Sequence, residues 1–150
     1  WVVGQKFHYD SAADAWDRDR GNVQATLLAS AVRTATPTVA DQTNYNGRGV
    51  LLVLDVTAEA AAETLSCKIQ AKSSVSAAYA DIVDFGIVYN AATAAPGAFT
   101  MLMGPGVVSA DGIGSTSFFK SGLLPRIWRV VITHSAAGSW TYSLGATTIL

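Results

Sequence analysis

The chain has 150 residues, half of them apolar and only 14% charged, and its 10 basic and 11 acidic residues give a net charge of −1. This length suits one domain with a substantial core, and the apolar content excludes a chain that is disordered throughout. Ordinary soluble domains carry charge on about a quarter of their residues, so we expect partners to cover part of this surface. A monomer with a surface of Ser, Thr, Ala and Gly is the alternative.

The distribution of charge excludes two classes of partner. The closest basic pair, Arg18 and Arg20, alternates with aspartates, and the other basic residues are scattered. Nucleic acids and anionic membranes both require a concentrated basic surface, so we expect neither. The longest apolar run, residues 50–54, is too short to span a membrane, and residues 1–6 show no signal-peptide pattern.

The single cysteine, Cys67, has no partner for an intrachain disulfide and cannot form a multi-cysteine zinc site. It lies in an alternating segment, which predicts a buried, inert thiol. A chain without disulfides suits synthesis in a reducing cytoplasm.

The first 23 residues differ from the rest of the chain. They hold two Trp, one His and one Tyr among four Asp and three basic residues, with no sustained period of 2 or 3.6. We therefore expect residues 1–23 to form an extended arm that a partner orders, and residues 24–150 to form one β-domain. A strand or loop folded back onto the same domain is the alternative for the arm.

Strand signals begin after this arm. Residues 25–33 are small and mostly apolar, and residues 41–47 are rich in turn formers and end in an Asn-Gly pair. Residues 49–56 are apolar apart from Asp55, which predicts a strand buried on both faces.

Further strands are predicted downstream. Residues 59–63 fit either one helical turn or a polar loop. Residues 65–72 alternate between apolar and polar, as a half-buried strand does, and residues 79–86 predict another strand. Residues 86–122 hold seven of the 13 glycines, which predicts a long loop region with one short strand at 99–103.

The C-terminal segment has the clearest pattern. Residues 126–134 predict a strand, residues 135–139 a turn and residues 140–144 a return strand, which together predict a hairpin. With about seven short strands and no amphipathic helix, the chain is predicted to be mostly β: an antiparallel β-sandwich or barrel of jelly-roll or tulip-like form with an extended N-terminal arm.

No nucleotide or calcium motif is complete. The chain has no Gly-Lys dipeptide and therefore no P-loop, and residues 112–114 begin like a dinucleotide fingerprint but Ser117 stands where its third glycine belongs. Residues 17–21 resemble the start of a calcium loop, but Leu28 occupies the position of the bidentate glutamate.

Catalytic pairs are also not evident. His8 and His134 lie far apart and lack further ligands for zinc. Asp81 and Asp84, three residues apart on a predicted strand, are expected to point to opposite faces. A Ser-His-Asp triad needs no proximity in sequence, but no serine lies in a nucleophile elbow. We expect no catalytic, cofactor-binding or metal-binding residue and no enzymatic activity; a lysin-type domain is the alternative.

Two tryptophans lie in the C-terminal segment. Trp128 and Trp140 are expected to pack in the core or on the hairpin. An aromatic platform that stacks on a sugar is the alternative.

Several segments resemble one family. They are residues 27–36, 40–50 (with Asn44-Tyr45-Asn46-Gly47-Arg48-Gly49-Val50), 54–57, 124–130 (Leu124-Pro125-Arg126-Ile127-Trp128-Arg129-Val130) and 140–146. They resemble small virion-associated proteins of tailed bacteriophages over roughly residues 27–72 and 123–150. The resemblance implies a structural component of the particle and carries over no catalytic residue. Within these segments, Pro125 marks a strand start, and Arg126 and Arg129 are expected to pair with Asp41 or Asp55.

The expected function follows from the resemblance and the composition. We expect a structural virion protein, first of all a capsid decoration (cement) protein that stabilises the head lattice and is assembled in the host cytoplasm. Its expected partners are copies of itself, as a homotrimer, and the major capsid protein or a neighbouring virion protein. The alternative is a tail-tip, baseplate or fibre-associated module that binds a host surface glycan.

Overall fold

The computed structural model describes residues 7–10, 15–18, 22–59, 63–110 and 116–150. These residues contain strands and no helix. In chain order the strands are β1 (Phe7–Asp10), β2 (Ala15–Arg18), β3 (Gln24–Arg33), β4 (Gln42–Thr43), β5 (Gly49–Ala58), β6 (Thr64–Lys72), β7 (Tyr79–Asn90), β8 (Gly97–Gly104), β9 (Ser117–Ser121), β10 (Ile127–His134) and β11 (Trp140–Ile149).

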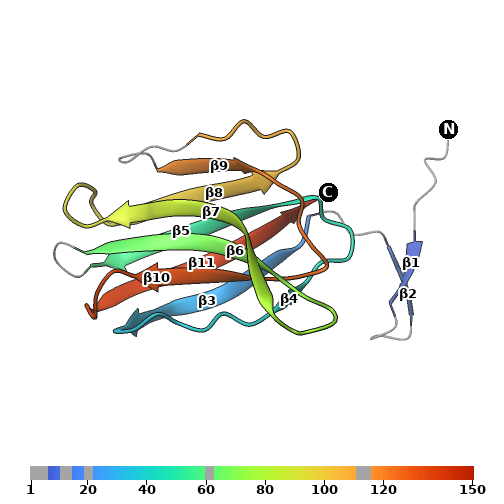
Figure 1. The fold of residues 1–150 in the computed structure, drawn as a ribbon, viewed down its shortest axis with the longest axis horizontal. Helices are drawn as coiled ribbons and strands as arrows, with labels where there is room; N and C mark the ends of the chain where they lie inside the picture. Colours follow the sequence, from blue (N-terminus) through green and yellow to red (C-terminus); the bar gives the residue numbers. More distant parts are fainter. Residues whose placement is uncertain (1–6, 11–14, 19–21, 60–62, 111–115) are drawn as a thin grey trace.

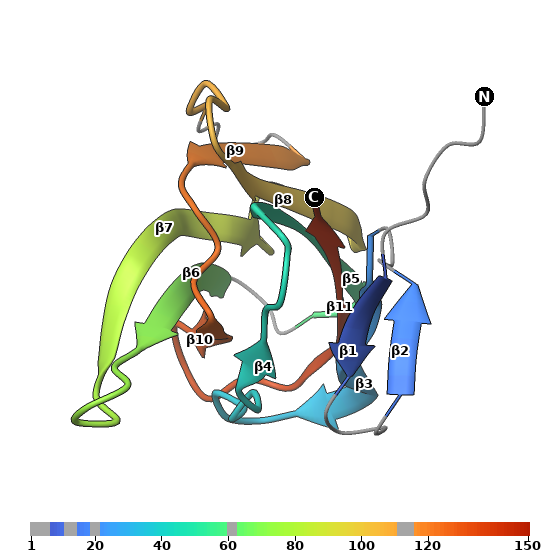
Figure 2. The same ribbon diagram turned by 90° about the vertical axis from the view of Figure 1, so that its right-hand side faces the viewer.

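The strands from β3 onward form two sheets that pack face to face, seen from one end in Figure 2. The five-stranded sheet has the order β3-β11-β5-β8-β9, and the four-stranded sheet has the order β4-β10-β6-β7. Neighbours are antiparallel except β8 and β9, which are parallel. Without β9, the eight remaining strands form two four-stranded sheets, β3-β11-β5-β8 and β4-β10-β6-β7, which is the strand order of a jelly roll. The predicted mostly-β sandwich of jelly-roll form is confirmed.

The core lies between the two sheets and is built by alternation along the strands. In β10 every second residue from Trp128 points inward and is buried, and in β6 the same holds from Leu65 to Ile69. The largest fully buried side chains include Trp128, Trp140 and Tyr142. The expected core positions of the two tryptophans and the expected burial of Cys67 are therefore confirmed.

The predicted C-terminal hairpin is wrong. Both strands exist, but β10 pairs with β4 and β6 while β11 pairs with β3 and β5. Residues 135–139 carry the chain from one sheet to the other. An alternating pattern shows which side of a strand is buried, but it does not show which strand lies beside it.

The prediction for residues 49–56 is wrong about burial. This strand, β5, buries one face completely, as Leu52 and Leu54 show, while Leu51 and Val53 on the other face are only partly buried. Its continuous apolar run is therefore not explained by burial on both sides within one chain.

The glycine-rich region 86–122 contains more strand than predicted. β7 continues to Asn90, and β9 was not predicted at all. β9 is short and pairs only with β8 within its sheet, so its sequence pattern is weak. Of the segment 59–63, residues 60–62 lie outside the described residues.

The N-terminal segment contributes a separate hairpin. β1 and β2 pair antiparallel, from Phe7 with Arg18 to Asp10 with Ala15, and belong to neither sheet. Figure 1 shows them beyond the end of the sandwich. This pairing was not predicted, and the role of residues 1–23 as an arm that a partner orders stays a prediction.

Candidate functional site

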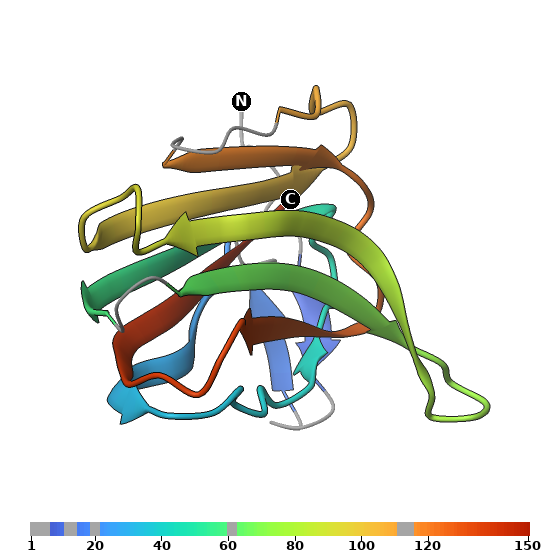
Figure 3. The same cartoon turned by 60° about the vertical axis from the view of Figure 1, so that its left-hand side comes forward.

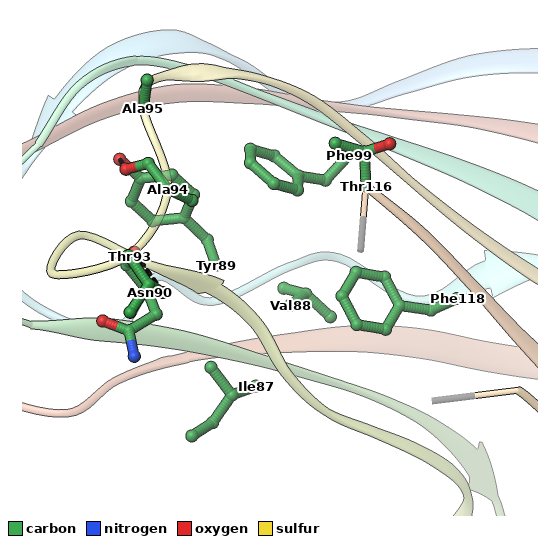
Figure 4. Close-up of a pocket in the computed structure, with 10 residues that line it drawn as sticks. All are labelled: Ile87, Val88, Tyr89, Asn90, Thr93, Ala94, Ala95, Phe99, Thr116 and Phe118. Carbon is green, nitrogen blue, oxygen red and sulfur yellow. Dashed lines mark hydrogen bonds between the residues drawn. The ribbon is translucent and has the colours of Figure 1, made fainter. Parts of the chain in front are cut away.

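A pocket of about 230 Å³ opens between the end of β7, the loop after it, β8 and β9 (Figure 4). Its lining is Ile87, Val88, Tyr89, Asn90, Thr93, Ala94, Ala95, Phe99, Thr116 and Phe118. The Tyr89 hydroxyl donates to the carbonyl of Ala94 at 3.1 Å, and the side-chain oxygen of Asn90 accepts the N–H of Ala92 at 2.9 Å. The lining includes no carboxylate, imidazole or thiol, so these residues supply no evident acid–base pair.

The outer surface of the four-stranded sheet, with Asp41 beside it, is the charged face. At its β7 edge, the Lys68 ammonium lies 3.0 Å from Asp81 and 3.4 Å from Asp84. Gln70 also donates to Asp81 at 2.7 Å. The hydrogen bonds from Gln70 and Lys68 lower the pKa of Asp81. This carboxylate therefore stays ionised at neutral pH, unlike a general acid.

The expected orientation of the two aspartates is wrong, because Asp81 and Asp84 contact the same lysine. The pairing of β6 with β7 contains register shifts. Next to Asp84, Gly86 has a φ of 70° and its N–H donates to the Asp84 carboxylate at 2.8 Å. These irregularities break the period of 2, so two residues three apart reach one face.

A second polar cluster lies at the base of the β6–β7 hairpin, which projects beyond the sandwich in Figure 3. The Lys72 ammonium lies 2.6 Å from Asp41, and the Tyr79 hydroxyl donates to the same carboxylate at 2.8 Å. Both bonds lower the pKa of Asp41. The Arg129 guanidinium lies 3.4 Å from the centre of the Tyr79 ring and donates to Gln70 at 2.9 Å.

The expected partners of the two C-terminal arginines are wrong. Arg129 binds Gln70 and Tyr79, while Lys72 takes the place predicted for it at Asp41. The Arg126 guanidinium stacks over the ring of Tyr45 at 5.0 Å. Without Arg126, which lies outside both clusters, the two clusters hold three cations and three carboxylates, so their charges balance.

The outer surface of the five-stranded sheet has a different composition, and we name it the bare face. Two of its cross-strand rows run over all five strands without a charge. They are Thr26–Gly145–Val53–Thr100–Ser117 and Gln24–Thr147–Leu51–Leu102–Phe119. A third row pairs Ser143, Asp55 and Ala98, and Asp55 is the only charged residue in these rows.

A buried polar cluster lies inside the sandwich, where β10 and β11 meet the turn that joins them. His134 is 9% exposed, and its Nε2 lies 2.9 Å from the Tyr142 hydroxyl. Its Nδ1 is buried without a hydrogen-bond partner among the described residues. Burial lowers the pKa of His134 and raises that of Tyr142 to about 12. The cluster keeps both side chains neutral near pH 7.

The remaining motif residues form no common site in the described part of the chain. Ser117 lies in β9, where its hydroxyl binds Thr100 at 2.9 Å, and Leu28 packs beside the core in β3. Burial raises the pKa of the Cys67 thiol, which disfavours a reactive thiolate. Residues 19–21 and 112–114 of the tested motifs lie outside the described residues, and nothing is described of the His8 side chain.

The described residues contain no group of three or more His, Cys, Asp or Glu side chains arranged to hold a metal ion. The described part of the chain also contains no helix that is long and apolar enough to cross a membrane.

The bare face was not predicted, although the sequence of β5 contains a signal for it. A strand with one solvated face alternates apolar with polar residues, whereas β5 keeps Leu51 and Val53 on its outward side. Burial of both faces within one chain and coverage of one face by a partner produce the same continuous apolar run. The sequence of residues 49–56 alone therefore does not distinguish them.

Comparison with protein-family models, with curated proteins and with solved structures finds no match to this chain. The surfaces and clusters described above are therefore the basis for a functional proposal.

Proposed function

We propose that the chain is a structural virion protein of a tailed phage, and specifically a capsid decoration protein that stabilises the head lattice together with copies of itself. The observation that carries the proposal is the segregation of charge. The charged face is neutralised and suited to water, while the bare face has one carboxylate, Asp55, in its cross-strand rows. A surface with so little charge is typical of one that a partner covers.

Two further observations support an architectural role. The strands from β3 onward form one sandwich with a continuous buried core. The β1–β2 hairpin belongs to neither sheet and lies beyond the end of the sandwich, an arrangement that suits contact with a neighbouring molecule. The particle as the setting, and the major capsid protein as the second partner, are expectations that come from the sequence of residues 27–72 and 123–150 alone.

A decoration protein needs only modest affinity at each site. Many equivalent contacts over a closed lattice act together, so the assembly holds where a single contact would dissociate. The proposed activity therefore needs a rigid body with two contact surfaces, one for its own copies and one for the shell.

The test uses phage heads from which the protein has been stripped. Stripped heads should release DNA at a lower temperature than intact heads, and adding the purified protein back should restore the original temperature. Stripped particles that keep their heat resistance but no longer adsorb to cells would overturn the proposal and favour the glycan-binding tail module. A variant lacking residues 1–23 tests whether the arm contributes to attachment.

A further inference from the structure

We infer that the bare face is the contact surface between copies of this chain, so that two five-stranded sheets pack against each other. This inference rests on the proposed function, which requires copies of the chain to assemble with one another. It adds the contact surface and its occupant, a second copy related by a two-fold axis, and this pair replaces the homotrimer expected from the sequence.

The first support is the apolar content of the outward positions. Leu51 and Val53 on β5 and Leu102 on β8 face outward from the two uncharged rows and are only partly buried within one chain. Phe119, at the β9 edge of the same row, is 36% exposed. Burying these side chains against a partner is favourable in proportion to the apolar area removed from water.

The second support is the shape and size of the face. Its outward positions include Gly145, Ser143 and Ala98, whose small side chains allow a close approach by another sheet. With strands about 4.8 Å apart and rows about 6.8 Å apart, a face that is five strands wide at Leu51 and Val53 and three strands wide toward Thr57 has a projected area of about 500 Å². Two copies would then bury about 1,000 Å², which reaches the lower limit for a specific interface.

The third support is electrostatic and favours a second copy as the occupant. A strongly charged partner would leave its own charges unpaired on this face. Two copies meet the same face with almost no charge, and only the Asp55 carboxylates need to avoid each other. With a two-fold axis through the apolar rows, the two Asp55 residues lie about 20 Å apart, which is beyond the screening length of physiological salt.

The charged face is less suited than the bare face to contact between copies. Packing it against another copy would remove Lys68, Lys72 and their carboxylates from water. Desolvating ion pairs that are already neutralised costs free energy and offers no new partner.

The test compares two valines in equivalent settings. Val53 of β5 and Val131 of β10 are both partly buried and both face outward, Val53 between Gly145 and Thr100 and Val131 beside Lys68. Wild type, Val53→Glu and Val131→Glu are measured by size-exclusion chromatography with light scattering over a range of concentrations. We expect the wild type to form an oligomer, Val53→Glu to weaken association at least about tenfold, and Val131→Glu to associate like wild type.

A second pair uses the opposite charge and guards against a folding defect. Thr147→Lys on the bare face should weaken association, while Thr133→Lys on the charged face should not; circular dichroism checks that each variant is folded. A wild type that stays monomeric at tens of micromolar, or variants on both faces with equal defects, would overturn the inference.

The head-binding assay separates this inference from the proposed function. A monomer that still restores heat resistance to stripped heads overturns the inference and leaves the function standing. An oligomer that depends on Val53 but does not bind heads supports the inference and overturns the decoration function.

Discussion

The two outer faces of the sandwich are built on the same kind of strand but differ in what they present to their surroundings. On the charged face, the outward neighbours of β10 include Lys68 and Gln70. On the bare face, Val53 has Gly145 and Thr100 as its cross-strand neighbours. Inward positions are apolar in both sheets, so the core does not distinguish them. The difference shows that the outward-facing residues of each strand, and not the inward-facing ones, distinguish the two faces as contact surfaces.

The largest expected effect is a loss of stability from a substitution in the core, which lies between the two sheets. Trp140→Ala should reduce the free energy of unfolding by about 3–5 kcal/mol, because it removes a fully buried aromatic side chain. The ring packs edge-on against Tyr89 at 5.6 Å, and its N–H donates to Glu63 at 3.2 Å. Denaturant unfolding measures the loss. Thr141→Ala, on the outward side of the same strand, is the control; an equal loss there would show that the inward and outward sides are assigned wrongly.

A smaller effect is expected at the outer strand of the bare-face sheet. The Arg33 guanidinium lies over the Tyr142 ring at 4.5 Å and donates to the carbonyls of Ala29 and Tyr142, beside irregular pairing of β3 with β11. Arg33→Ala removes the stacking on Tyr142 and the donor to a part-buried carbonyl, and it should cost about 1 kcal/mol of stability in thermal or denaturant unfolding.

Arg33→Lys is the matched control, because it keeps the charge but not the forked donor geometry. It should restore only part of the stability. Full stability in Arg33→Ala would mean that water satisfies the carbonyls equally well.

The sequence predicted the inward side of the molecule better than the outward side. The alternation of Leu65, Cys67 and Ile69 specified the buried face of β6 because it depends only on local geometry. The pairing of β10 and β11 depends on which sheet each strand joins, and the local sequence pattern does not determine the sheet. The common orientation of Asp81 and Asp84 depends on register shifts that alternation alone cannot reveal. The bare face needed the sheet order before its rows could be recognised.

An effect of pH is expected from the buried cluster between the faces. Burial lowers the pKa of His134 in the folded protein, and Arg33 also disfavours its protonation while Glu63 favours it. Below the unfolded-state pKa of about 6.5, the unfolded chain therefore binds a proton that the folded protein does not yet bind. Stability from this group is present above that pH and is lost as the pH falls toward the lower, folded-state pKa.

Thermal melts of wild type and His134→Gln between neutral and mildly acidic pH measure this contribution. The variant should lose part of the acid-induced destabilisation, while His8 remains in both proteins. Parallel pH profiles would show that His134 does not contribute.

The smallest effect is expected on the charged face. Asp81→Asn removes one of the two carboxylates at Lys68, which still has Asp84 nearby. Because these groups are largely exposed and screened by salt, the melting temperature should change little at physiological ionic strength, and association should not change. A loss of association in this variant would show that the charged face takes part in the contact.

Hydroxyl-radical footprinting over a range of protein concentrations tests the coverage of the bare face most directly. As the protein associates, the modification of Leu51, Leu102 and Phe119 should fall, while that of Tyr79 and Val131 on the charged face should stay constant. Protection confined to the charged face, or none on the bare face while light scattering reports an oligomer, would contradict the account.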